Sequence, residues 1–340
     1  MGCTRRTNSR GGCSRNDVRD VILFALLLQL PESLPPKPAP PPAAWRSRIG
    51  AYAAGSDTLY VYEDGGALVA LLTPFSPVRL SQASESAFTF SGQRPYNAGG
   101  IVFRRGEIEV GRLALRRLEL GPADGGQLRL RPVRPVAELL VADRALVPPA
   151  ESGAFLPPDL IEPSTIDSTI HLDVRYSTTN NFLGSVFYSS AHAFLQRPAA
   201  LALVRAARVL RPLGYGILIH DAYRPWYVTK VFWDATPPAS RWLVADPARG
   251  SKHNRGAAVD LTLYELATGK PVEMPSTYDE ATPRALSDFP GGTSRQRWHR
   301  ALLRRVLEAQ GFAVNPREWW HFDYRDWQRY PILNTPFEEP

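Results

Sequence analysis

The chain has 340 residues, a length typical of two domains, and its 44% hydrophobic and 21% charged content is typical of a globular protein rather than a disordered or fibrous one. The net charge of +7 is small for this length, and no stripe of lysine and arginine with interleaved aromatic residues is present, which argues against nucleic-acid binding. Both cysteines, Cys3 and Cys13, lie near the N-terminus, so the rest of the chain has neither a disulfide nor a thiolate metal ligand.

Residues 1–44 are predicted to be a signal-like leader followed by a proline-rich linker. Five arginines precede the apolar run at 21–30, which is too short to span a bilayer and is typical of a secretory signal. We therefore expect a secreted or periplasmic protein with no integral membrane association after leader removal. The alternative is a buried N-terminal helix and a linker, in which case the protein stays in the cytoplasm.

Residues 45–148 are predicted to form a β-rich accessory domain. Short runs of β-branched and aromatic residues alternate with turn signals such as Glu63-Asp-Gly-Gly66. The spacing predicts an antiparallel sheet of six to eight strands or a small barrel, with strands at 59–62, 67–72, 87–90, 100–103, 108–110 and 113–115. No histidine lies here, so we expect a structural or docking module; a ligand-binding barrel is the alternative.

Residues 151–337 are predicted to form the second domain, and their composition differs from that of the preceding region. All six histidines and seven of the eight tryptophans lie here. Helical periodicity is present at 199–210 and 294–310, and 215–220 is typical of a buried strand. A final strand is expected between 314 and 322. This mixture of helices and short strands predicts an α+β fold.

Three segments of this domain carry candidate metal ligands and catalytic groups. His253 and Asp260 are separated by a glycine turn, so a hairpin-like return can bring both together, and His321 is a candidate third ligand. Imidazole and carboxylate are ordinary ligands of Zn²⁺, and three protein ligands leave an open position for water. Glu318 fits the general base that activates this water, and Arg224 fits a fixed cation that stabilises the oxyanion.

Together with two further motifs, these segments resemble the zinc D-alanyl-D-alanine dipeptidases of the VanX type. The residues that carry the resemblance are His253-Asn-Arg-Gly-Ala-Ala-Val-Asp260-Leu-Thr-Leu, Asp221-Ala-Tyr-Arg-Pro225, Glu318-Trp-Trp-His-Phe322, Asp173-Val-Arg-Tyr176-Ser-Thr-Thr-Asn-Asn-Phe-Leu-Gly184 and Met274-Pro-Ser-Thr-Tyr-Asp279. The five motifs cover roughly residues 160–335 in order. The resemblance implies a compact α+β zinc-peptidase core of mixed helices and an antiparallel sheet, related to D,D-carboxypeptidases and preceded here by the small all-β domain.

The resemblance also implies roles in metal binding and catalysis. His253, Asp260 and His321 would bind one Zn²⁺ per catalytic domain. Glu318 would be the catalytic base and would later donate a proton to the leaving amine, while Arg224 would stabilise the transition state.

Four further residues match positions around the substrate. Ser251 and Tyr176 would lie near the dipeptide, and Asp279 would bind its free ammonium group. Asp221 matches a carboxylate next to the pocket, and we expect it to orient Arg224.

The expected function is therefore hydrolysis of the peptide bond of D-Ala-D-Ala by a zinc-bound water, with this small dipeptide as partner and cell-wall peptides as further candidates. One alternative is a D,D- or L,D-carboxypeptidase that trims peptidoglycan peptides. Another is a catalytically inactive wall-binding protein, although the complete set of candidate residues argues against it. A secreted enzyme would meet wall turnover fragments rather than a cytoplasmic precursor.

Overall fold

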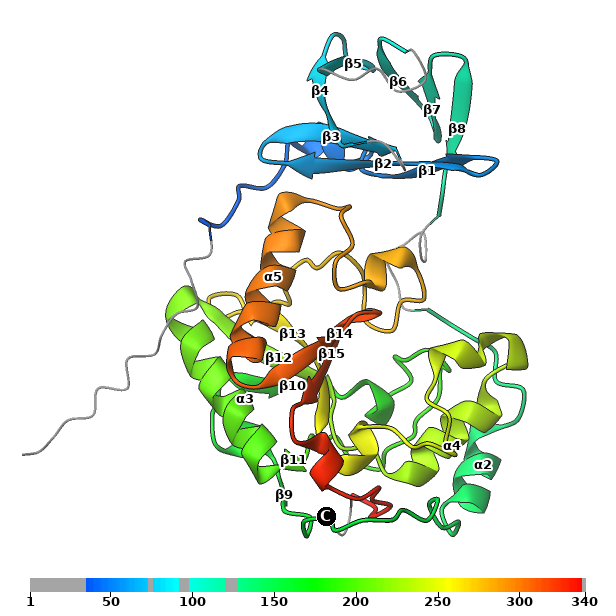
Figure 1. Cartoon of the computed structure of the whole chain (residues 1–340), viewed down its shortest axis with the longest axis vertical. Helices are drawn as coiled ribbons and strands as arrows, with labels where there is room; N and C mark the ends of the chain where they lie inside the picture. Colours follow the sequence, from blue (N-terminus) through cyan, green and yellow to red (C-terminus); the bar gives the residue numbers. More distant parts are fainter. Residues whose placement is uncertain (1–34, 73–75, 92–97, 120–127, 338–340) are drawn as a thin grey trace, which may run out of the picture. The chain divides into compact units, whose positions relative to one another are not determined.

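The computed structural model describes residues 35–72, 76–91, 98–119 and 128–337 (Figure 1). The apolar run of the predicted leader lies outside these residues, so the leader and the export inferred from it stay predictions, as do the domain boundaries. The described residues group into one compact unit. Within the described part of the chain, none of the helices has the length and apolar character needed to cross a membrane.

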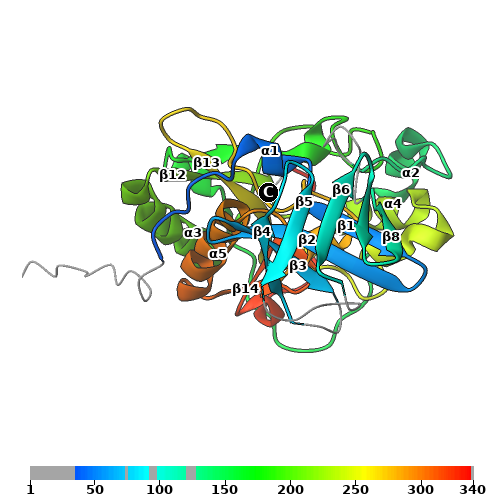
Figure 2. The same ribbon diagram turned by 90° about the horizontal axis from the view of Figure 1, so that it is seen from above.

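The strands between residues 50 and 117 form a closed antiparallel barrel in which each strand pairs with the next (Figures 1 and 2). They are β1 (Gly50–Ala54), β2 (Asp57–Asp64), β3 (Ala67–Leu72), β4 (Val78–Gln82), β5 (Ala87–Ser91), β6 (Gly100–Arg104), β7 (Glu107–Val110) and β8 (Leu113–Arg117). The barrel closes because β1 pairs with both β2 and β8. Gly65 and Gly66 in the β2–β3 turn have φ angles of 54° and 76°, as a type I′ hairpin turn requires.

Apolar side chains fill the barrel interior. Leu59 and Val61 on β2 and Ile108 and Val110 on β7 point inward at alternate positions, and each is at most 1% exposed. Eight strands is the upper end of the expected range; β1 and β4 had no strand of their own in the sequence prediction.

A five-stranded mixed sheet forms the centre of the α+β core, in the order β10–β12–β13–β15–β14. The strands are β10 (Ile170–Leu172), β12 (Tyr215–Asp221), β13 (Ala258–Glu265), β14 (Phe312–Asn315) and β15 (Glu318–Tyr324). The α+β class is confirmed, but the sheet is not purely antiparallel. The long connection through α3 (Arg197–Leu210) allows β10 to run parallel to β12. The single final strand that we expected is a hairpin of β14 and β15.

Helices flank this sheet on two sides. In Figures 1 and 2, α3 and α5 (Ser294–Ala309) lie on one side of the core strands, and α4 (Trp226–Ala235) and α2 (Val136–Asp143) lie on the other. Strand residues such as Ile217, Leu261 and Phe322 pack with the buried residues of α3 and α5. Because side chains alternate along a strand, the intervening positions face the opposite side.

The remaining elements are short. A two-stranded sheet pairs β9 (Leu160–Ile161) with β11 (Leu195–Gln196), and α1 (Ala43–Arg46) precedes the barrel. The helix α2 falls in a region where the sequence indicated only strands. Its Leu139 is fully buried in an apolar cluster with residues of α4, so packing against the core explains a helix that has little polar–apolar periodicity of its own.

Candidate active site

Three neighbouring strands place carboxylate and imidazole side chains in one row. Asp260 on β13 is the cross-strand partner of His321 on β15 and of Asp221 on β12. Partners of this kind have Cβ atoms about 4.5–5.5 Å apart, so the three side chains meet on the sheet itself. A shift of register between Ile219 and Asp221 places Asp221, rather than His220, opposite Asp260.

His253 reaches the same point from a 3-10 turn (His253–Arg255) just before β13. Gly256 follows with a φ of 62°, and a Cβ atom there would lie 2.5 Å from the side chain of Leu160, so glycine is required. The expected hairpin-like return is therefore a helical turn closed by a left-handed glycine. His253 Nδ1 lies 2.6 Å from the carbonyl oxygen of Ala222, which leaves Nε2 directed at the row.

The donor atoms of His253, Asp260 and His321 converge within 4.8 Å of one another. His253 Nε2 lies 3.1 Å from His321 Nδ1 and 3.4 Å from Asp260 Oδ1, and the last two atoms are 2.9 Å apart. Ligand atoms around a tetrahedral zinc with bonds of about 2.0–2.2 Å lie roughly 3.3–3.6 Å apart. Two of the three donor distances are shorter than this range, so a bound ion would move these atoms slightly apart. The number and chemistry of the donors fit a divalent metal ion.

Asp323 orients the His321 ring through Nε2, the nitrogen that does not face the other two donors. His321 Nε2 lies 2.9 Å from Asp323 Oδ1, and Lys252 Nζ donates to Asp323 Oδ2 at 2.5 Å. Burial lowers the pKa of His321, but hydrogen bonds to Asp260 and Asp323 raise it to about 10. A metal ion must therefore displace a proton from this imidazole. Asp323 was not among the predicted site residues, although a spacing of two residues on a strand places it on the same face as His321.

Arg224 is a buried cation beside this cluster. Its Nε and Nη2 donate to Asp221 Oδ2 at 3.0 and 2.6 Å, and Tyr188 donates to the other carboxylate oxygen at 2.7 Å. Burial disfavours the charge, but the Asp221 carboxylate raises the pKa of Arg224 well above its usual value. The guanidinium lies 4.7 Å from the centre of the Phe232 ring, which limits its movement.

Glu318 lies at the start of β15, with Oε2 3.9 Å from His321 Nδ1. Residues three apart on a regular strand face opposite sides, but the pairing of β14 with β15 is irregular here and sets Glu318 opposite Asn315. Asn315 Nδ2 donates to Glu318 Oε2 at 2.9 Å. Burial raises the pKa of Glu318, although the His321 imidazole opposes this shift.

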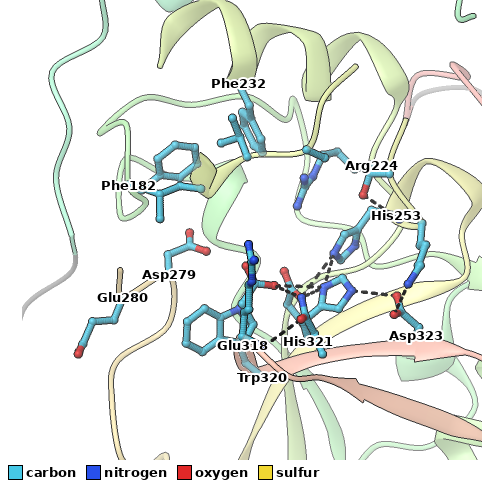
Figure 3. Close-up of a pocket in the computed structure, with 18 of the residues that line it drawn as sticks. Phe182, Arg224, Phe232, His253, Asp279, Glu280, Glu318, Trp320, His321 and Asp323 are labelled. Carbon is cyan, nitrogen blue, oxygen red and sulfur yellow. Dashed lines mark hydrogen bonds and ion pairs between the residues drawn. The ribbon is translucent and has the colours of Figure 1, made fainter. Parts of the chain in front are cut away.

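Asp279 lies across the cavity from Asp323 (Figure 3). The segment 266–293 that joins β13 to α5 carries it, with a φ of 58°. Tyr176 donates to Asp279 Oδ2 at 3.0 Å, while burial and the Asp260 carboxylate raise the pKa of Asp279 well above its usual value. Tyr278 was not among the predicted site residues despite its position next to Asp279. It donates to Asp260 Oδ2 at 2.9 Å.

These groups surround one cavity of about 470 Å³. Of the nine predicted site residues, eight line it: Tyr176, Arg224, Ser251, His253, Asp260, Asp279, Glu318 and His321. Asp221 stands behind Arg224 and contacts it directly. Ser251 Oγ accepts from the backbone N–H of His253 at 3.3 Å. The structure thus brings together residues that lie up to 145 positions apart in the sequence.

Two histidines that the sequence placed near the motifs have other surroundings. The ring of His220 packs 4.8 Å from that of Tyr278, and its Nδ1 lies 3.3 Å from Asp173 Oδ2. The ring of His171 stacks on Tyr264 at 4.4 Å. Neither belongs to the group of three donors.

Comparison with known proteins links this site to one family. A family model described as D-ala-D-ala dipeptidase matches residues 159–339. The D-alanyl-D-alanine dipeptidase of Escherichia coli (strain K12) is 30% identical over 179 residues, covering 53% of this chain and 91% of the relative. The protein of the same name from Enterococcus faecium is 32% identical over 199 residues, covering 52% and 96%. That from Streptomyces coelicolor is 31% identical over 191 residues, covering 51% and 93%.

Proposed function

Because the chain belongs to the D-Ala-D-Ala dipeptidase family of peptidases, we propose that it is a zinc-dependent enzyme that hydrolyses the peptide bond of D-alanyl-D-alanine. The observation that carries this proposal is the convergence of His253, Asp260 and His321, with the Glu318 carboxylate 3.9 Å from His321 Nδ1. The relatives carry the name D-alanyl-D-alanine dipeptidase, which supports the choice of dipeptide.

Zinc in this site would polarise the scissile carbonyl and lower the pKa of water. Neighbouring groups hold the ligand side chains in position for the ion. The Ala222 carbonyl fixes the ring of His253, and Asp323 fixes the ring of His321. Burial disfavours the anion of Asp260, but the two imidazoles hold the pKa of Asp260 well below its usual value.

Glu318 performs the proton transfers in this mechanism. Burial raises the pKa of Glu318 toward neutral pH. A carboxylate with such a pKa can accept a proton from water and return it to the leaving amine. The Asn315 amide fixes the orientation of this carboxylate.

Arg224 stabilises the negative charge that develops on the carbonyl oxygen. A fixed cation in a buried site is effective because it needs no reorganisation during the reaction. Asp221 provides the fixed position through two hydrogen bonds from the guanidinium.

Asp279 and Tyr176 would hold the free amino group of the dipeptide. In the absence of a cation, burial raises the pKa of Asp279, and a substrate ammonium group would stabilise its charged form. A longer peptide has no positive charge at this point and would leave a buried carboxylate unpaired. This favours a dipeptidase over a carboxypeptidase, with Ser251 near the opposite end of the substrate.

The test is a panel of the four Ala-Ala stereoisomers together with N-acetyl-D-Ala-D-Ala and a wall pentapeptide. We expect the zinc-loaded full chain to cleave D-Ala-D-Ala, with chelation abolishing and zinc restoring the activity. Efficient cleavage of the acetylated or longer peptides would support the carboxypeptidase alternative. Hydrolysis by a zinc-free protein that resists chelation would overturn the metal mechanism.

We also propose that the enzyme acts outside the cytoplasm, on the evidence of the arginine-rich segment and apolar run at 21–30. Cell fractionation tests this proposal. Full-length protein retained in the cytoplasm of its own host would contradict it.

A further inference from the structure

The barrel contacts the core through a buried glutamate on β2. Glu63 is 2% exposed, and its Oε2 accepts from the backbone N–H of Ser294 at 2.7 Å. Its Oε1 accepts from Ser294 Oγ at 3.1 Å and from the backbone N–H of Gly66 at 2.9 Å. The backbone N–H of Glu63 donates to the carbonyl of Gly292 at 3.1 Å. Both carboxylate oxygens are therefore satisfied, as a buried charge requires.

Further contacts join the same strand to the same part of the core. Arg297 Nη2 donates to the carbonyl of Glu63 at 2.8 Å and to Asp64 Oδ1 at 2.9 Å. The Tyr60 ring packs edge-on against the Phe289 ring at 5.9 Å. The barrel thus contacts both the first turn of α5 and the residues just before it.

Glu63 also supplies a charge that α5 lacks. The helix begins with a capping box formed by Thr293 and Gln296, but its first turn contains no acidic residue. A carboxylate at a helix N-terminus is stabilising because it faces the positive end of the helix dipole. Glu63 therefore fixes the starting point of α5 as well as the chain that leads into it.

The segment that ends at this contact carries Asp279. Asp279 has a left-handed φ of 58°, which a residue other than glycine maintains only when its surroundings hold it. Six residues into the segment, the Val272 N–H donates to the Leu263 carbonyl at 3.0 Å and holds the chain against β13. Its other end is Gly292, which Glu63 holds. In between, Arg284 pairs with Glu280, the neighbour of Asp279, at 2.6 Å.

We propose that the barrel positions the substrate-binding segment, with Glu63 as the positioning residue that keeps Asp279 aligned for the ammonium group of the dipeptide. This inference rests on the proposed function. The family model matches residues 159–339, so Glu63 and the barrel lie in the part of the chain that the family match does not cover.

The test compares Glu63→Ala with Glu109→Ala in the zinc-loaded full chain. Glu109 is also a barrel glutamate, but its carboxylate bonds Arg104 on the barrel surface. We expect Glu63→Ala to raise the KM for D-Ala-D-Ala about threefold to tenfold, the scale of one ordinary hydrogen bond, with kcat nearly unchanged. Amide hydrogen exchange should become faster in residues 272–293. Glu109→Ala should change neither quantity.

A milder variant keeps the test decisive if Glu63→Ala does not fold. Ser294→Ala removes only the hydroxyl contacts and should shift KM and exchange in the same direction by a smaller amount. A folded Glu63→Ala or Ser294→Ala protein with wild-type KM and exchange would overturn the proposal, as would a fall in kcat at unchanged KM. Failure of the wild type to cleave D-Ala-D-Ala would refute the proposed function, whereas the exchange experiment would still decide whether the barrel holds the segment.

Discussion

The barrel and the core sheet use β-structure differently. The barrel closes on itself, so its strands enclose one interior, and apolar residues such as Leu59 and Ile108 fill it. The core sheet is open and has two faces. One packs on α3 and α5, while the other holds Asp260 and His321, both of which are largely buried from water. An open sheet can thus separate the residues that stabilise the fold from those that form the reactive site.

Removing Glu318, the proposed general base, should affect catalysis and leave the fold unchanged. We expect Glu318→Gln to lower kcat by about 10²- to 10⁴-fold, because the amide cannot accept the proton from water. Zinc content and the melting temperature should stay near wild type, since Glu318 is not among the three donors. Glu308→Gln on the exposed side of α5 is the matched control. Hydrolysis at a wild-type rate would show that another group is the base.

Truncating a barrel core residue should lower the stability of the fold rather than kcat. Leu59 is fully buried, so Leu59→Ala should lower the free energy of unfolding by about 2–5 kcal/mol through lost burial and a residual cavity. Denaturant unfolding measures this change. The control is Leu213→Ala, whose side chain is 41% exposed. A loss of less than about 0.5 kcal/mol would mean that the barrel interior is not close-packed.

Weakening the support of His321 should change metal affinity. Asp323→Asn removes the negative charge that holds His321 Nε2 and should weaken zinc binding by about 10- to 100-fold. Competition with a chelating dye measures the zinc Kd. Asp326→Asn changes a nearby carboxylate whose side chain is 40% exposed. Equal zinc affinities in the two variants would contradict the assigned role of Asp323.

The smallest effect concerns a buried histidine of α5 that lies outside the site. Burial lowers the pKa of His299 below its usual value of 6.5, so the unfolded chain takes up a proton that the folded chain resists. Stability should therefore fall as the pH drops from about 7, by about 1.4 kcal/mol for each unit of pKa difference. His299→Gln should reduce the change in melting temperature between pH 7.5 and 5.5. Substitution of the exposed His171 should leave this change as it is in the wild type. Identical pH dependence in both variants would refute this origin.

The sequence predicted the elements whose signals are local. The apolar periodicity of α3, the turn at Gly65 and Gly66, and the buried strand ending at Asp221 all depend on neighbouring residues, and each is present in the structure. The mixed α+β class followed from the same signals. The helix α2 was missed because its folding depends on packing with α4, which its own residues do not encode.

The assembly of the site depends on irregularities that no local pattern reveals. The register shift before Asp221 and the irregular pairing at Glu318 decide which way these side chains face. Motif spacing identified both residues as candidates, but it could not place Asp323, Tyr278 or Asn315 beside them. Tyr278 reaches Asp260 from a separate segment of the chain. Asp323 and Asn315 lie only two and three residues from their partners His321 and Glu318, and these contacts depend on the strand geometry and on the irregular pairing of β14 with β15.

The pairing of Asp260 with His321 ties ion capture to chain alignment. A slip of β15 by one residue along β13 would put Trp320 or Phe322 opposite Asp260 and would dismantle the donor set. Metal binding during refolding would then report that β13 and β15 have paired in their native register.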